Sequence, residues 1–367
     1  MRLGVLFLLI FATPGWAQQQ NPDQLLDQAI AEQQRGDFQA AIRDYRKVLE
    51  IRPDMVEAKA NLGAALAHAG ELDEAIAIYN SVLPSLSDKT PVLLNLGLAY
   101  YKKGDFAHAQ EQFAAVNKLE PSNSRVAILL ADADVRLGHQ AEAVALLEPL
   151  DAANAQNLDF QFVYGSALIG VGRLRDGVPR VEQVAAATQN ASAYLLAGAS
   201  RLQMNDYESA RSDLEAALRL DPQLPNIYTL VGSARDKTGD SKSAEPALRE
   251  ALKRNPDDFE ANLTLGAILY KRRELNEART LLDHSLRLKP EDPVARYEFA
   301  MLKSAAGEYN DAAQLLETLV KDQPNWLDPH IELAALYYKL HRPQDGAKER
   351  EIVERLSAEQ QSKKRQP

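Results

Sequence analysis

The chain has 367 residues, of which 46% are hydrophobic, 26% are charged and 7% are aromatic. This composition is ordinary for a folded protein and excludes a disordered or fibrous chain. The formal net charge of −10 argues against a nucleic-acid partner, because nucleic acids select a basic surface. The chain contains no cysteine, which excludes disulfides, thiol chemistry and thiolate metal sites.

The first 17 residues differ from the rest of the chain. Arg2 supplies a positive charge, an apolar run extends from Leu3 to Ala12, and small residues stand at Gly15 and Ala17. This order predicts a secretory signal peptide cleaved after Ala17, and therefore an exported protein, periplasmic or secreted. The apolar run is too short to span a bilayer, which takes about 20 residues, and no other segment predicts a membrane span. Residues 18–21 form a polar leader.

The rest of the chain repeats with a period of 34 residues. Within each period, apolar residues recur at three- and four-residue spacing, stop, and recur again, which predicts two amphipathic helices joined by a short turn. In six of the periods a glycine falls inside the first helix, where a missing side chain is expected to let the second helix lie close. The period is visible in Pro222, Pro256, Pro290 and Pro324, in Gly63, Gly97, Gly165, Gly198, Gly232 and Gly266, and in Ala41, Ala75, Ala109, Ala143, Ala210, Ala244, Ala278 and Ala312.

A second set of glycines stands between the two predicted helices of a period. A residue in the left-handed conformation commonly ends a helix, and glycine adopts that conformation without steric cost. We therefore expect left-handed helix ends at Gly36, Gly70, Gly104, Gly138, Gly172, Gly239 and Gly307.

The third period carries the pattern most fully, and it reads Leu93, Leu96, Gly97, Tyr100, Gly104, Ala109, Phe113 and Pro121. It resembles the tetratricopeptide repeat, although the usual Trp at its first position is absent. The resemblance covers residues 22–356 and implies an all-α, right-handed superhelical solenoid of about ten helix-turn-helix units. The units are expected to begin near Pro22, Val56, Thr90, Ser124, Leu158, Ala191, Pro225, Phe259, Pro293 and Leu327.

The pattern weakens in the middle and at the carboxyl end. Residues 151–157 form a loose stretch rich in Ala, Asn and Gln. Sequence drift in a tolerant fold is one interpretation, and a bend between residues 22–150 and 158–356 is the other. The last unit has a highly charged second helix, which suits the end of a stack. Residues 357–367 are a polar, partly basic tail.

Searching for catalytic chemistry yields little. None of the six histidines lies near another at metal-ligand spacing, and no phosphate-binding loop or nucleophile elbow occurs. Many carboxylates lie four residues from a base on predicted helix surfaces, which indicates surface ion pairs. The sequence therefore predicts no enzyme, no metal and no cofactor.

The resemblance implies that first helices line a concave face that takes an extended peptide or a partner helix. Asn side chains there can hold a peptide backbone, because the amide has both donors and an acceptor. The apolar residues of the middle units predict a groove, but they also fit a core if the register slips. The candidate partner-binding residues are Asn61, Asn95, Leu98, Tyr101, Leu129, Phe162, Val163, Ile169, Leu196, Tyr270, Tyr297 and Tyr338.

The signal peptide and the repeats together predict a scaffold or adaptor in the cell envelope that binds a protein or peptide partner. The envelope role is an analogy at the level of fold. A self-assembling structural repeat protein is the alternative hypothesis, and an enzyme is a remote one.

Overall fold

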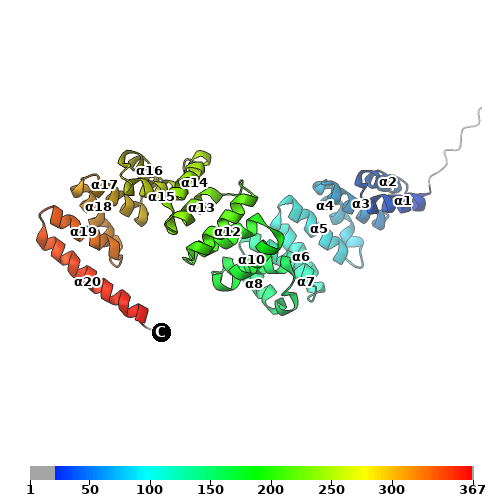
Figure 1. Ribbon diagram of the computed structural model, residues 1–367. Helices are drawn as coiled ribbons and strands as arrows, with labels where there is room; N and C mark the ends of the chain where they lie inside the picture. The colour runs from blue at the N-terminus through cyan, green and yellow to red at the C-terminus, as the bar shows by residue number, and fades with distance from the viewer. Residues whose placement is uncertain (1–20, 366–367) are drawn as a thin grey trace, which may run out of the picture. The chain divides into compact units, whose positions relative to one another are not determined.

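A computed structural model describes residues 21–365 of the chain. The predicted signal peptide and the first three residues of the polar leader lie outside the described residues. The chain divides into two compact units, unit 1 (Met1–Val171) and unit 2 (Gly172–Pro367). In both units every regular element of the described part is a helix (Figure 1).

The described part of unit 1 consists of helices joined by short turns. Each first helix up to α7 packs against the second helix that follows it, and that second helix packs against the next first helix. The α-helices are α1 (Pro22–Gln34), α2 (Phe38–Ile51), α3 (Val56–Ala69), α4 (Leu72–Val82), α5 (Thr90–Lys103), α6 (Phe106–Leu119), α7 (Ser124–Leu137), α8 (Gln140–Leu147) and α9 (Leu158–Gly170), with short 3₁₀ turns at Leu83–Ser85, Glu148–Leu150 and Ala152–Asn154.

The described part of unit 2 continues the same arrangement, from α10 through five helix pairs. The prediction of an all-α fold built from consecutive helix pairs is confirmed. The helices are α10 (Leu174–Thr188), α11 (Ala191–Gln203), α12 (Tyr207–Leu220), α13 (Ile227–Lys237), α14 (Ser241–Arg254), α15 (Phe259–Lys271), α16 (Leu275–Leu288), α17 (Pro293–Ala305), α18 (Tyr309–Asp322), α19 (Leu327–Lys339) and α20 (Pro343–Arg365).

Caps and turns explain where the helices begin and end. Asn123 accepts from backbone N–H groups at the start of α7, and Asp105 does so at the start of α6, which satisfies donors that a helix leaves free. All seven turn glycines have φ between 81° and 87°, as expected. Where a turn lacks glycine, Arg273 and His341 adopt the left-handed conformation instead, with φ of 68° and 58°.

The glycines inside first helices allow the close packing that the sequence predicts. A Cβ atom at Gly97 would lie 2.6 Å from the ring of Phe113, and one at Gly63 would lie 2.7 Å from the ring of Tyr79. The small residue Ala109 is buried nearby, but the atoms closest to Gly97 belong to Phe113 and Gln112. A large side chain on the second helix therefore fills the space that the glycine leaves.

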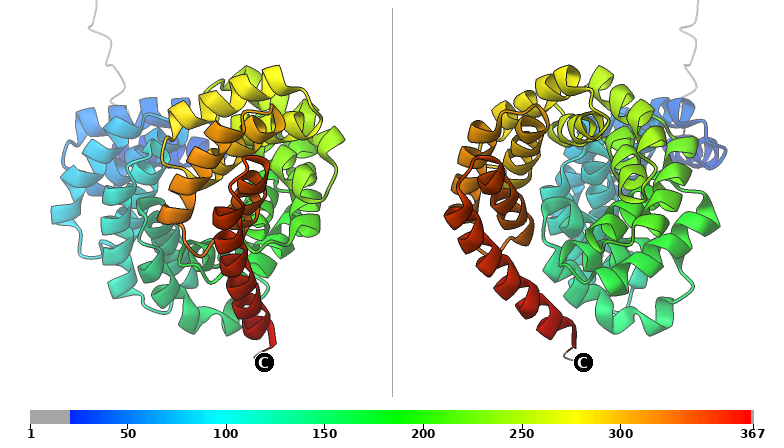
Figure 2. Two further views of the ribbon diagram at one scale, coloured as in Figure 1. Left: turned by 90° about the vertical axis from the view of Figure 1, so that its left-hand side faces the viewer. Right: turned by 60° about the vertical axis from the view of Figure 1, so that its left-hand side comes forward.

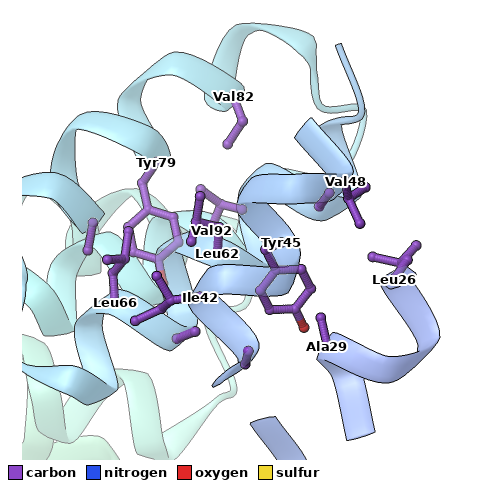
Figure 3. Close-up of a cluster of buried hydrophobic side chains, with 14 of the residues drawn as sticks. Leu26, Ala29, Ile42, Tyr45, Val48, Leu62, Leu66, Tyr79, Val82 and Val92 are labelled. Carbon is purple, nitrogen blue, oxygen red and sulfur yellow. The ribbon is translucent and has the colours of Figure 1, made fainter. Parts of the chain in front are cut away.

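Successive hairpins share one core. In Figure 3, Ile42 and Tyr45 of α2 lie among Leu62 and Leu66 of α3 and Tyr79 of α4, and all five side chains are buried. No hairpin covers its own apolar face, so each depends on its neighbour for burial, as in other repeat proteins.

Polar side chains occupy the position of the missing Trp in the last three repeats. Asn262 Nδ2 donates to the carbonyl of Pro256 at 2.9 Å, and Arg296 Nε donates to that of Pro290 at 3.0 Å. A ring nitrogen of His330 lies 3.2 Å from the carbonyl oxygen of Pro324. These contacts, all spanning six residues, tie each first helix to the loop that precedes it.

Residues 151–157 contain a 3₁₀ turn, Ala152–Asn154, that side-chain hydrogen bonds hold in place. Asn154 is buried, and its Nδ2 donates to the carbonyl of Leu150 at 2.8 Å and to the hydroxyl of Ser124 at 3.3 Å. Gln161 donates to the carbonyl of Asn154. The compact units divide after Val171, beyond this stretch, and the bend stays a prediction.

The polar tail that begins at Ser357 is helical as far as Arg365. Helix α20 spans 23 residues, and it runs well past its hairpin partner α19, as the red helix in Figure 2 shows.

Candidate functional site

A groove of about 560 Å³ opens on the first-helix face of unit 1. We define the first-helix face as the surface formed by α1, α3, α5, α7 and α9 in unit 1 and by α11, α13, α15, α17 and α19 in unit 2. The groove lies between α7 and α9, which contact each other directly beside the short second helix α8. It is lined by Arg125, Ile128, Leu129, Asp132, Arg136, Asn157, Asp159, Phe162 and Val163.

The floor of the groove is apolar and partly open to solvent. Ile128, Leu129 and Phe162 are half-buried, whereas Val163 is 6% exposed and belongs to the core around Phe160. The sequence left open whether these residues form a groove or a core, and the structure places them at the boundary. Ile128, Leu129 and Phe162 line the groove with their exposed atoms, and Val163 packs in the core below them.

Charged and aromatic side chains fix one rim of the groove. The hydroxyl of Tyr101 donates a hydrogen bond to Asp132, and Arg136 Nε lies 3.7 Å from the same carboxylate. The guanidinium of Arg136 also lies 5.4 Å from the ring centre of Phe106 and 5.7 Å from that of Tyr101. Burial, followed by the bond to Asp132, raises the pKa of Tyr101 to about 12, so this hydroxyl stays a donor at neutral pH.

Two further charged residues of the groove have no ion pair in the described part of the chain. Arg125 and Asp159 are exposed near the starts of α7 and α9, and neither has a salt bridge within residues 21–365. An exposed pair of opposite charges flanking an apolar floor suits a segment that has an apolar anchor and polar flanks.

Asn61 and Asn95 stand at the same place on α3 and α5, one period apart. Both are half-buried, and no side-chain hydrogen bond of either amide is found in the part of the chain that the structure describes. Asn61 also borders a smaller cavity of about 380 Å³. There Phe38 stacks on His68 with ring centres 4.8 Å apart.

The remaining sequence candidates fall in different places. Leu98 and Tyr101 pack with Leu129 around Phe113, and so continue the apolar surface from α5 to α7. Ile169 is half-buried on α9 and does not line the groove. Leu196 lies on α11 of unit 2. The structure therefore brings together five of the candidates, which are Leu98, Tyr101, Leu129, Phe162 and Val163.

The three tyrosine candidates belong to unit 2. Burial and the nearby Glu298 raise the pKa of Tyr270, and burial and Glu332 raise that of Tyr297. Tyr338 is 42% exposed and borders a cavity of about 310 Å³ on α19 and α20.

Sequence reasoning missed the charged residues of the groove, namely Asp132, Arg136 and Asp159. Asp132 and Arg136 are four residues apart, and such pairs were assigned to solvent-facing surfaces. Their positions in the repeat could have identified them. Asp132 and Arg136 lie on the same side of α7 as Ile128, and Asp159 lies on the same side of α9 as Phe162.

Among the described residues, no group of three or more His, Asp or Glu side chains could hold a metal ion. No helix in residues 21–365 is long and apolar enough to cross a membrane.

The stacked hairpins define a helical repeat protein. Models of the tetratricopeptide repeat match residues 26–89, 100–162, 191–224 and 237–297. These matches cover more than half of the chain, which belongs to the tetratricopeptide repeat family. The family's fold is typical of protein-interaction scaffolds.

Solved structures show the same fold. The chain is 15% identical to a tetratricopeptide repeat protein from Parabacteroides merdae ATCC 43184, with a TM-score of 0.50, over 68% of this chain and 98% of that one. It is 14% identical to a chain in the APC/C hetero-tetramer Cut9–Hcn1, with a TM-score of 0.51, over 94% of this chain and 76% of that one. No curated protein matches the sequence significantly.

Proposed function

We propose that the protein is a non-enzymatic scaffold that binds a peptide or helix of a partner protein in the α7–α9 groove of unit 1. The observation that carries the proposal is the groove itself, whose apolar floor is half-exposed and whose rim is charged. Exposed apolar surface of this kind commonly marks an interaction site. An apolar side chain of the partner would enter between Leu129 and Phe162.

Polar groups around the groove would orient the partner. Arg125 of α7 and Asp159 of α9 offer a free cation and a free anion beside the groove. Asn61 and Asn95 extend the surface along α3 and α5, where their amides can bond a peptide backbone. Contacts of this kind fix direction and register, while the apolar anchor supplies most of the affinity.

We further propose that the scaffold works in the cell envelope after export. The support is the amino-terminal sequence, with Arg2, the apolar run to Ala12 and the small residues Gly15 and Ala17. Amino-terminal sequencing of the mature protein should give Gln18 as the first residue. A mature chain that still begins at Met1 would contradict the proposal.

A substitution on the groove floor tests the binding site. Phe162→Glu places a charge where the partner's apolar side chain would sit, so capture of the partner from envelope extracts should fall at least tenfold. Leu119→Glu is the matched control, because Leu119 is 60% exposed on α6 and lies outside the groove. Equal capture by the two variants, with both folded by circular dichroism, would contradict the site.

Self-assembly is the competing hypothesis, and light scattering separates it from partner binding. The proposed scaffold keeps the mass of one chain across a concentration series. A mass that rises with concentration in the wild type and stays constant in Phe162→Glu would instead assign the groove to a second copy.

A further inference from the structure

Unit 2 carries a second polar cluster on its first-helix face, where α15, α17 and α19 follow one another (Figure 1). Tyr270 comes from α15, Tyr297 and Glu298 come from α17, and Glu332 comes from α19. Glu298 and Glu332 stand one period apart, at the repeat position that Asn61 and Asn95 occupy in unit 1. The same position therefore has a different chemistry in each unit.

Glu298 holds a carboxylate oxygen that the protein itself does not satisfy. Its Oε2 atom is buried and has no hydrogen-bond partner among the described residues. Burial raises the pKa of Glu298, while Lys271 and the hydroxyl of Tyr270 act in the opposite direction. Lys271 lies too far away for an ion pair within the described part of the chain. The hydroxyl of Tyr270 donates to this carboxylate, but a buried carboxylate oxygen without a donor costs stability. A donor from a partner would offset that cost.

The surroundings of Glu298 suit a cation. Glu332 and Asp328 add negative charge beside Tyr297, and Glu298 and Tyr297 lie close to Tyr270. Tyrosine rings attract cations through their faces, and the ammonium of Lys271 already lies 5.8 Å from the ring centre of Tyr270.

This cluster differs from the groove of unit 1 in charge. Two arginines and two aspartates line the groove in equal numbers. Glu298, Glu332 and Asp328 lie near Tyr297, and Asp236 adds a fourth carboxylate near Glu298, whereas the cations acting on Glu298 among the described residues are Lys271 and Lys237. The excess of negative charge selects a basic partner.

We propose that the α15–α19 surface of unit 2 binds a basic segment of a partner protein, whose Lys or Arg side chain donates to Glu298 between Tyr270 and Tyr297. The surface is separate from the groove of unit 1 and does not depend on the function proposed for that groove. Its occupant is recognised by charge and by aromatic contact, whereas the occupant of the groove is recognised by an apolar anchor.

Fluorescence anisotropy with the full chain tests the proposal. The probe is a fluorescein-labelled peptide of alternating lysine and alanine, titrated at low salt. Glu298→Gln should weaken binding at least tenfold, because the amide keeps the shape of the side chain and loses its charge. Glu208→Gln removes one charge from an exposed site on α12 of the same unit and should change the affinity less than twofold. Phe162→Glu should leave probe binding intact.

A stability measurement separates binding from a structural role. If Glu298 serves a partner, Glu298→Gln replaces a buried carboxylate whose Oε2 atom has no donor, so the variant should unfold at the same or a higher denaturant concentration than the wild type. Loss of binding together with unchanged or increased stability supports the site. Equal probe affinity for Glu298→Gln and Glu208→Gln, no binding by the wild type, or a clearly less stable Glu298→Gln would each overturn it.

Discussion

At the scale of single residues, the contact between a helix glycine and a large side chain of the next helix sets how closely each hairpin packs. Gly97 and Phe113 are the clearest case, with 2.6 Å between the ring and the place where a Cβ would lie. The sequence predicted the close packing from the 34-residue period. It did not identify Phe113 as the contact, because a repeat pattern records spacing and not which atoms meet.

Replacing this glycine tests the packing. Gly97→Val should destabilise the protein by about 1–3 kcal/mol, because the added carbons overlap the ring of Phe113. Ala107→Val, at an exposed site on α6, is the control for the helix propensity of valine, and it should cost less than about 1 kcal/mol. Denaturant unfolding measures both changes. Equal losses in the two variants would show that Gly97 does not lie at a tight crossing.

The polar residues that replace the signature Trp could not be interpreted from sequence. Asn262, Arg296 and His330 look unrelated as a set, and each would usually be assigned to the surface. Only the folded chain shows that all three bind the carbonyl of the proline six residues earlier. Different side chains thus satisfy the same carbonyl acceptor of the repeat, which a pattern of residue types cannot reveal.

At the scale of helices, a cluster of charged side chains joins α10, α11 and α12, and we expect it to make stability depend on pH. Arg201 pairs with Glu182 and Asp206, and its Nε lies 3.7 Å from Asp213 Oδ2. Burial, and then the negative charge of Glu182, raises the pKa of Asp213 to about 7, despite the opposing charge of Arg201. Oδ2 of Asp213 is buried and has no hydrogen bond within residues 21–365.

The sign of the pH effect follows from this shift. Between about pH 4 and pH 7, folded Asp213 holds a proton that the unfolded chain releases, so its contribution to stability falls as pH rises and is constant above pH 7. Asp213→Asn removes this loss. The variant should exceed the wild type in unfolding free energy by about 1–2 kcal/mol at pH 8 and by little at pH 4. Denaturant unfolding at the two pH values that shows an equal difference at both would contradict the assignment.

Helix positions were largely predictable, and the groove was less so. Apolar spacing and turn glycines mark nearly every hairpin, because a helix must bury one stripe of its surface. The seventh first helix differs, since it begins at Ile227, two residues after the expected Pro225. The groove depends on the short α8, which ends where a 3₁₀ turn containing Pro149 begins, and on direct contact between α7 and α9. The spacing of residues along the chain does not predict such contacts between helices of successive repeats.

At the scale of the whole molecule, the two units share a fold and differ in the chemistry of their first-helix faces. Unit 1 offers an apolar groove with a balanced charged rim, and unit 2 offers an acidic, tyrosine-rich surface. Repeat proteins commonly combine distinct surfaces on one scaffold, because each hairpin contributes only a few outward residues. The account therefore assigns two different partner segments to one chain.

Site-specific photocrosslinking tests whether a partner binds in the α7–α9 groove. A benzoylphenylalanine residue would replace Leu129 on the groove floor in the full chain, with the same replacement of the exposed Leu119 as the control, and both would be irradiated in cells. We expect a discrete crosslinked protein from position 129, lost when Phe162→Glu is added, and none from position 119. Absence of any adduct at position 129, or identical adducts at both positions, would contradict partner binding in the groove.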